Sequence, residues 1–249
     1  MTEFFEIFLT WQGWLYLFIL TMLEIVLGID NIIFISIVTD NLPKIKKRKA
    51  RNIGLSLALI IRLILLCGAA WIMKLTYPLF TIFDKDISWQ SIVLIVGGIF
   101  LIYKSTIEMH KSVKGVEEGQ QKTKSSLNAI ILQIIVIDII FSFDSIISAV
   151  GMTNGIEAET HSNPLAIIFI SVIFSMIIML IFSGAISSFI SENPTIKMIA
   201  LSFLVTVGIL LIAEAFDSKI PKGYVYFGLV FSLIVELMNI KMRKNSALK

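Results

Sequence analysis

Seven long apolar stretches dominate the chain, and each is bounded by charged residues, proline or asparagine. Stretches such as LALIIRLILLCGAAWI and AIIFISVIFSMIIMLIF are continuous rather than alternating, which indicates membrane-spanning helices and not the strands of a β-barrel. About 20 apolar residues cross a bilayer as a helix. The pattern therefore predicts an all-α, polytopic membrane helix bundle with spans at about 13–38, 53–73, 88–107, 128–150, 164–190, 196–216 and 223–240.

The composition supports this prediction and leaves no room for a soluble domain. The 249 residues are 57% hydrophobic, and the mean hydropathy of +0.90 leaves too few polar groups to cover a water-facing surface. The first apolar run is too long for the core of a secretory signal, so we treat it as a true span. We expect residues 1–249 to form a single transmembrane domain.

The basic residues are distributed unevenly between the two ends of the predicted spans. Of the 21 Lys and Arg residues, 16 fall on one side, in the run 44–51, the segment 104–124, the tail 241–249 and at Lys197. By the positive-inside rule, the N-terminus lies outside and the C-terminus is cytoplasmic. We interpret the run 44–51 as a topology signal that contacts anionic lipid headgroups, and not as a nucleic-acid site.

The first and fourth spans contain the same acidic motif. EIVLGIDNIIFIS at 24–36 aligns without gaps with DIIFSFDSIISAV at 138–150, and GIFLIY at 98–103 in the third span matches GILLIA at 208–213 in the sixth. Because a unit of three helices is odd, the second copy must enter the membrane from the opposite side. The sequence predicts two inverted three-helix repeats, at about 13–107 and 128–216, and an extra helix at about 223–240.

Four carboxylates lie within the apolar spans, where each costs roughly 2.5–3.5 kcal/mol to insert. A pseudo-two-fold axis would bring the two motifs together, and carboxylates packed in a low dielectric require either protonation or a cation. Oxygen ligands suit Mg²⁺, Ca²⁺ or Mn²⁺ better than Zn²⁺ or Cu⁺. These considerations indicate a divalent-cation site, with proton exchange as a hypothesis for coupling, formed by Glu24, Asp30, Asp138 and Asp144.

Helical spacing refines this expectation. Residues seven apart share one face of a helix, so Glu24 should lie on the same face as Asn31, and Asp138 on the same face as Ser142 and Ser145. Asp30 and Asp144 would sit to one side of these faces. We expect Gly28 to let the first span unwind, which would turn both of its acids onto one site.

Arg62 is the only basic residue inside a predicted span. We interpret it as a counter-charge and not a ligand, because a guanidinium has no lone pair to offer a metal. One arginine cannot balance four acids. The alternative hypothesis is that the acids pair with Arg62 and only hold the helices together.

The remaining polar residues indicate no other chemistry. We expect Glu214, Asp217 and Glu236 to lie at the membrane interfaces, and His110 and His161 to lie in solvated loops. The sequence contains no nucleotide-binding loop, dinucleotide fingerprint, catalytic triad or His-x-x-x-His pair, so we expect neither an enzyme nor an ATP-driven pump.

Three stretches, EIVLGIDNIIFIS at 24–36, DIIFSFDSIISAVG at 138–151 and IPKGYVYFGLVFSLIVELMN at 220–239, resemble the TerC family of integral membrane proteins. The resemblance covers nearly the whole chain and implies inverted three-helix repeats plus a terminal helix, related to the LysE-type transporter superfamily. It also implies Mn²⁺ efflux, although other members are linked only to tellurite resistance or membrane-protein biogenesis. The ligands that it implies are Glu24, Asp30, Asn31, Asp138, Asp144 and Ser145.

The leading hypothesis is therefore a bacterial inner-membrane exporter of a divalent cation, Mn²⁺ first, that works by alternating access between the two repeats. Its partners would be the cation and the lipid bilayer. Two alternatives stay open at this point: a non-transporting membrane scaffold or factor for biogenesis or tellurite resistance, and a Ca²⁺ exchanger.

Overall fold

The fold is known from a computed structural model that describes residues 6–40, 42–68, 77–82, 85–114, 127–160, 165–218 and 220–247. Its contacts divide the chain into two compact units, the first made of Met1–Tyr77 and Lys124–Ser187 and the second of Pro78–Thr123 and Ser188–Lys249. Seven helices of the described part are long and apolar enough to cross a membrane. The prediction of seven spans is confirmed.

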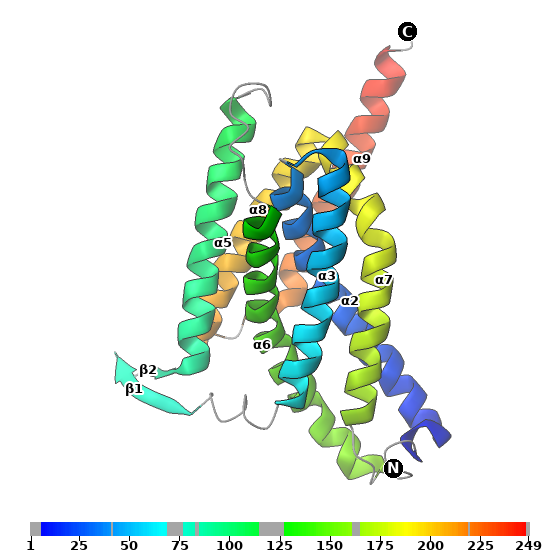
Figure 1. Ribbon diagram of the computed structural model, residues 1–249, viewed down its shortest axis with the longest axis vertical. Helices are drawn as coiled ribbons and strands as arrows, with labels where there is room; N and C mark the ends of the chain where they lie inside the picture. The colour runs from blue at the N-terminus through cyan, green and yellow to red at the C-terminus, as the bar shows by residue number, and fades with distance from the viewer. Residues whose placement is uncertain are drawn as a thin grey trace. The chain divides into compact units, whose positions relative to one another are not determined.

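The first unit contains four of these helices (Figure 1). A short 3₁₀ helix, η1 (Glu6–Leu9), precedes them, and they are α2 (Trp11–Asp40), α3 (Lys44–Cys67), α6 (Leu127–Thr160) and α7 (Leu165–Glu192), the last as far as Ser187. Each is apolar nearly all round apart from the basic start of α3, as expected of helices that meet both lipid and protein.

Helix α3 begins earlier than the span predicted at 53–73. It starts directly after Pro43 and includes the basic run 44–51, because Lys and Arg are good helix formers and their long side chains can reach away from an apolar surface. The helix ends at Cys67. The predicted segment 69–73 lies outside the described residues.

The second unit begins with a short β-hairpin, which the sequence did not predict and which is added to an otherwise helical fold. Strands β1 (Pro78–Ile82) and β2 (Lys85–Ser88) pair antiparallel, and β2 leads directly into α5 (Trp89–Lys114). Ser88 caps that helix: its hydroxyl accepts from the Ser91 N–H at 3.1 Å, and the Ser91 hydroxyl accepts from the Ser88 N–H at 3.2 Å. The hairpin is too short to leave a periodic signal in the sequence.

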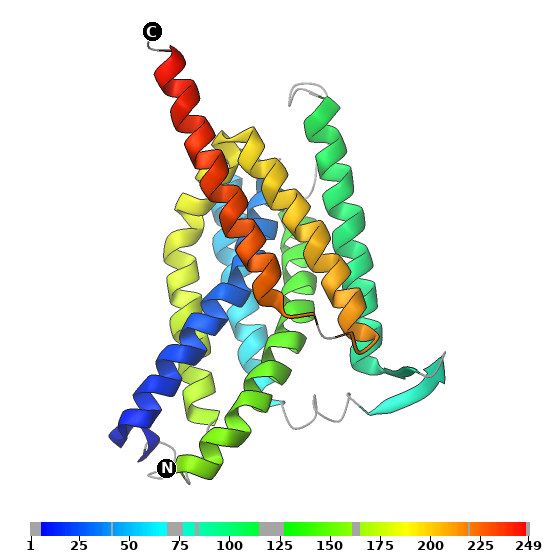
Figure 2. The same ribbon diagram turned by 180° about the vertical axis from the view of Figure 1, so that it is seen from behind.

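Helices α5 and α8 (Pro194–Ala215) pack along most of their length in this unit, as both views show (Figures 1 and 2). A Cβ atom on Gly98 would lie 2.5 Å from the Gly208 carbonyl oxygen, and one on Gly208 would lie 2.8 Å from the Gly98 carbonyl oxygen. Glycine is required at both positions because the two backbones touch. The contact is reciprocal, with Ile212 flanking Gly98 and Ile102 flanking Gly208.

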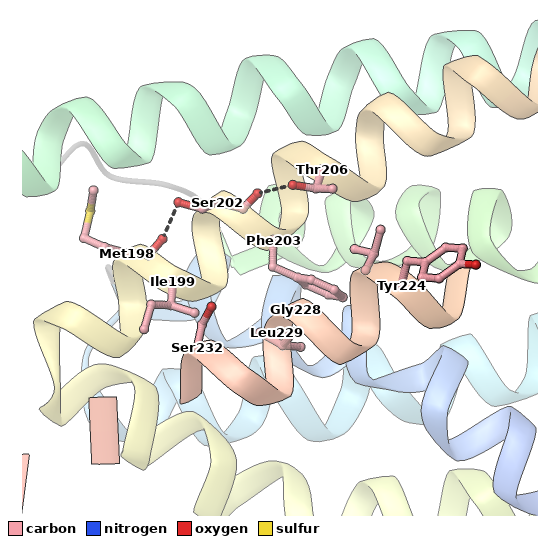
Figure 3. Close-up of a pocket in the computed structure, with 10 residues that line it drawn as sticks. Met198, Ile199, Ser202, Phe203, Thr206, Tyr224, Gly228, Leu229 and Ser232 are labelled. Carbon is pink, nitrogen blue, oxygen red and sulfur yellow. Dashed lines mark hydrogen bonds between the residues drawn. The ribbon is translucent and has the colours of Figure 1, made fainter. Parts of the chain in front are cut away.

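The last helix, α9 (Lys222–Ala247), packs on α8 beside a groove of about 590 Å³ (Figure 3). Phe203 of α8 lies against Tyr226 of α9, with ring centroids 5.8 Å apart. The hydroxyls of Ser202 and Thr206 donate to the carbonyl oxygens of Met198 and Ser202 in their own helix. These two hydroxyls are therefore engaged within α8 and not by a partner in the groove.

Helix α2 is continuous through Gly28, so the predicted break there is wrong. A Cβ atom on Gly28 would lie 2.2 Å from the Met179 sulfur of α7. Gly28 therefore provides a close contact between two helices and not a flexible point, and Met179 acts as a packing residue.

Replacing Gly28 with alanine should test this reading. The new methyl group overpacks the contact with Met179, and we expect a loss of about 1 kcal/mol in the free energy of unfolding in detergent. Adding Met179→Ala should give a favourable coupling energy of about 1 kcal/mol, since the methyl group fills space that the thioether vacates. A helix unwound at Gly28 would show no coupling between the two sites.

Candidate functional site

Charged side chains from three helices of the first unit meet in its interior. Glu24 of α2, Arg62 of α3 and Asp138 of α6 are exposed by 2%, 1% and 3% respectively. All three lie well inside helices that can span a membrane. We refer to Glu24, Arg62 and Asp138, together with Asn31 and Ser142, as the charge cluster.

Arg62 is the centre of the charge cluster, and its guanidinium bonds both neighbouring helices. Nη1 donates to Oε2 of Glu24 at 2.8 Å, and Nη2 donates to Oδ1 of Asp138 at 3.3 Å. Nε donates to the hydroxyl of Ser142 at 3.1 Å. The prediction that Arg62 acts as a counter-charge is confirmed.

Asp138 receives hydrogen bonds on both of its oxygens. Oδ1 accepts from Nδ2 of Asn31 at 3.1 Å as well as from Arg62, and Oδ2 accepts from the Ser142 hydroxyl at 3.3 Å. The last of these bonds joins residues four apart on α6, as the helical spacing predicted. Asn31 links α2 to the same carboxylate, so the faces expected from the sequence do converge.

Of the predicted ligands, the structure brings Glu24, Asn31 and Asp138 together in the charge cluster. Asp30 is buried at 4% exposure beside Asn31 on α2. Ser145 is buried, and its hydroxyl donates to the Ser142 carbonyl oxygen at 3.3 Å. The side chain of Asp144 lies outside the described residues. Among the described residues, no group of three or more His, Cys, Asp or Glu side chains is arranged to hold a metal.

The charges of the cluster do not cancel. One guanidinium faces two carboxylates, and Arg62 is the only basic residue among the side chains that the structure describes as buried. A buried charge is tolerated when it is paired and hydrogen-bonded, and an excess of one sign favours an ion of the other. Either a proton on one of the acids or an added cation would balance the charges.

The oxygen atoms present fit a hard divalent cation. The cluster offers carboxylate, amide and hydroxyl groups, and the amide oxygen Oδ1 of Asn31 is buried without a hydrogen-bond donor among the described residues. Mg²⁺, Ca²⁺ and Mn²⁺ prefer such oxygen ligands.

Ser142 was not among the predicted site residues, although helical spacing placed it on the same face as Asp138. The structure shows that it bonds both Arg62 and Asp138. His110 was predicted to lie in a loop, whereas it lies in α5, which extends to Lys114. His161 lies outside the described residues. In the second unit, Glu214 pairs with Lys222 at 3.4 Å, and Glu236 accepts a 2.5 Å hydrogen bond from Thr195.

The described residues form seven helices able to span a membrane, and the first unit buries a charge cluster, features that define a multi-pass integral membrane protein. The pattern of the "Integral membrane protein TerC family" matches residues 9–247. The chain therefore belongs to the TerC family. No solved structure matches it.

Named relatives place the chain in the inner membrane. It is 46% identical over 237 residues to the UPF0053 inner membrane protein YgdQ of Escherichia coli strain K12, covering 95% of this chain and 96% of that protein. It is 44% identical over 235 residues to a UPF0053 protein of Haemophilus influenzae, covering 94% and 95%. The match to the inner membrane protein YoaE of E. coli K12 is 42% over 234 residues and covers 93% of this chain but 43% of that protein. The chain is a multi-pass inner-membrane protein.

Proposed function

We propose that the protein is an inner-membrane carrier for a divalent metal cation, with Mn²⁺ as the leading substrate. The observation that carries this proposal is the charge cluster, in which Arg62 alone opposes Glu24 and Asp138 inside spanning helices. Intramembrane ionisable residues mark ion pathways in transport proteins. A cation in passage would neutralise the excess negative charge.

The proposal includes inverted repeats. Gly98 contacts Gly208 and Ile212, while Gly208 contacts Gly98 and Ile102, so equivalent positions of α5 and α8 exchange equivalent contacts. A two-fold axis between the helices produces this kind of reciprocity. In the first unit, α2 and α6 carry the matching acidic motifs and meet through Asn31 and Asp138. These two contacts support a pseudo-two-fold relation between the repeats.

Transport would proceed by alternating access, in which each repeat moves against the other about the ion site. The N-terminus would lie outside and the C-terminus in the cytoplasm, as the basic residues indicate. Protons that replace the metal on the acids would couple export to the proton gradient. The direction of transport is efflux in this proposal, in line with the resemblance described above.

A second candidate function is a non-transporting scaffold. Arg62 joins α2, α3 and α6 through Glu24, Asp138 and Ser142, which is what acids that serve only helix assembly would require. In that case, neutralising an acid would weaken the fold. In a carrier, removing an ion ligand would leave the fold intact and stop the flux.

Uptake of metal by proteoliposomes tests the proposal directly. We expect the purified protein to carry Mn²⁺, and Asp30→Asn and Asp144→Asn to reduce the rate at least about tenfold, because even residues that only support metal ligands cost 10- to 100-fold. Gly228→Ala is the matched control, since nothing lies within 4 Å of a Cβ atom at that position. Competition with Ca²⁺ and Mg²⁺ identifies the preferred ion.

Thermal unfolding of the same variants separates the two candidate functions. A carrier predicts folded Asp30→Asn and Asp144→Asn proteins without flux. Folded variants that carry Mn²⁺ at the wild-type rate would overturn the proposal, whereas unstable variants of a wild-type protein that carries no metal would favour the scaffold.

A further inference from the structure

The side-chain amide of Asn31 has only one orientation that fits its surroundings. Its Nδ2 lies 3.1 Å from Oδ1 of Asp138, which can only accept a hydrogen bond when the carboxylate is ionised. Turning the amide over would place two oxygen atoms in contact. The position of Asp138 therefore keeps the Asn31 carbonyl oxygen turned away from that carboxylate oxygen.

That carbonyl oxygen is available for another interaction. Asn31 is exposed by only 3%, and its Oδ1 accepts no hydrogen bond from the part of the chain that the structure describes. A buried acceptor without a donor costs free energy that a ligand can recover. An amide oxygen is a ligand that hard divalent cations select, and Asp30, the preceding residue on α2, is buried as well.

Within the described part of the chain, both side-chain oxygens of Asp138 accept hydrogen bonds, unlike the Asn31 amide oxygen. They accept from three donors on three side chains, namely Asn31 and Arg62 on Oδ1 and Ser142 on Oδ2. Glu24 is held by the 2.8 Å bond from Arg62. These carboxylates are engaged by protein donors, in contrast to the amide oxygen that Asp138 orients.

We infer that Asp138 is a positioning residue, which together with Arg62 holds the amide of Asn31 so that its Oδ1 binds the transported cation. This inference rests on the proposed function, because it assigns roles within the same ion site. It divides the charge cluster into orienting residues, Arg62 on α3 and Asp138 on α6, and a cation-binding oxygen on α2. The same logic operates at metal sites where a hydrogen-bonded partner fixes the orientation of a ligand.

Three substitutions separate an orienting role from direct binding. Asp138→Asn keeps an oxygen that can accept from both Asn31 and Arg62, while its amino group can donate to the Ser142 hydroxyl. Asp138→Leu removes every acceptor. Asn31→Leu removes the proposed ligand but leaves the bonds that Arg62 makes to Glu24 and Asp138 in place.

The readout is the rise in unfolding temperature of the purified protein with increasing Mn²⁺, which gives a dissociation constant without any transport. We expect Asp138→Leu and Asn31→Leu to raise this constant about 10- to 100-fold. Asp138→Asn should raise it clearly less than either, because it gives up one negative charge but keeps the acceptor that orients the Asn31 amide. Unfolding temperatures without metal, measured in parallel, show whether each variant is folded. If Asp138→Leu does not fold, the dissociation constants of Asp138→Asn and Asn31→Leu are compared. A positioning role for Asp138 predicts the weaker binding in Asn31→Leu.

The outcomes distinguish this inference from the proposed function. If wild-type protein is not stabilised by Mn²⁺, Ca²⁺ or Mg²⁺, the ion site itself is wrong. If the wild type binds metal but Asp138→Asn binds as weakly as Asp138→Leu, Asp138 is a ligand and the positioning role is overturned. Unchanged affinity in Asn31→Leu would overturn it as well, while leaving the carrier proposal in place.

Discussion

Replacing Arg62 with methionine should lower the free energy of unfolding by about 3–5 kcal/mol, the cost of removing one partner from a buried ion pair. Arg62 is 1% exposed, and its guanidinium bonds Glu24, Asp138 and Ser142. Without it, two carboxylates would face each other in the interior of the first unit. Reversible unfolding in mixed micelles, followed by circular dichroism, measures the loss.

Neutralising the acids should recover much of that loss. Arg62→Met combined with Glu24→Gln and Asp138→Asn leaves no uncompensated charge, and buried charge networks can be replaced by neutral groups at little cost. Lys111→Met is the control, because Lys111 is 53% exposed in its pair with Glu108 and should contribute less than about 1 kcal/mol. If Arg62→Met and Lys111→Met lowered the free energy of unfolding equally, Arg62 would not be a structural counter-charge.

Placing a methyl group between α5 and α8 should be the other large perturbation. Gly98→Ala puts a Cβ atom 2.5 Å from the carbonyl oxygen of Gly208, and a backbone cannot rotate away as a flexible side chain can. We expect a loss of about 1–3 kcal/mol from overpacking. Gly208→Ala should behave alike, since the contact is reciprocal.

The double variant makes this prediction specific. Once one methyl group has separated the two helices, the second meets less resistance, so Gly98→Ala and Gly208→Ala together should cost less than the sum of the single changes. Gly228→Ala, with open space around its Cβ atom, should be neutral or stabilising by up to about 1 kcal/mol. Additive losses, or a loss at Gly228 of the same size, would contradict a close backbone contact.

The spans were predictable because crossing a bilayer imposes a length and an apolar composition on each segment separately. Each of the seven predicted ranges overlaps a helix, and the agreement is good for helices such as α7 (Leu165–Glu192) and α8 (Pro194–Ala215). The ends were less predictable, because α3 and α5 continue into charged segments that are good helix formers. The hairpin of β1 and β2 gave no signal, since strands of five and four residues are shorter than the patterns that reveal strands.

The role of Gly28 shows how a local signal can mislead. A glycine two residues before an acid is compatible with a broken helix and with a close helix contact, and the neighbouring sequence does not distinguish them. The sulfur of Met179, about 150 residues further along the chain, decides for the contact. The same limit applies to Gly98, whose backbone contact is with Gly208, 110 residues further along the chain.

Sequence alone determined that this chain is a membrane helix bundle with acids in two matching motifs, because burial in lipid and helical spacing act within single segments. Only the tertiary structure decided which charges meet. Arg62 reaches Glu24 and Asp138 from a third helix, and Asn31 turns its amide toward Asp138, through contacts between residues 38 to 107 positions apart. Electrostatic energy depends on distances in space, and these are set by the packing of α2, α3 and α6 and not by their order along the chain.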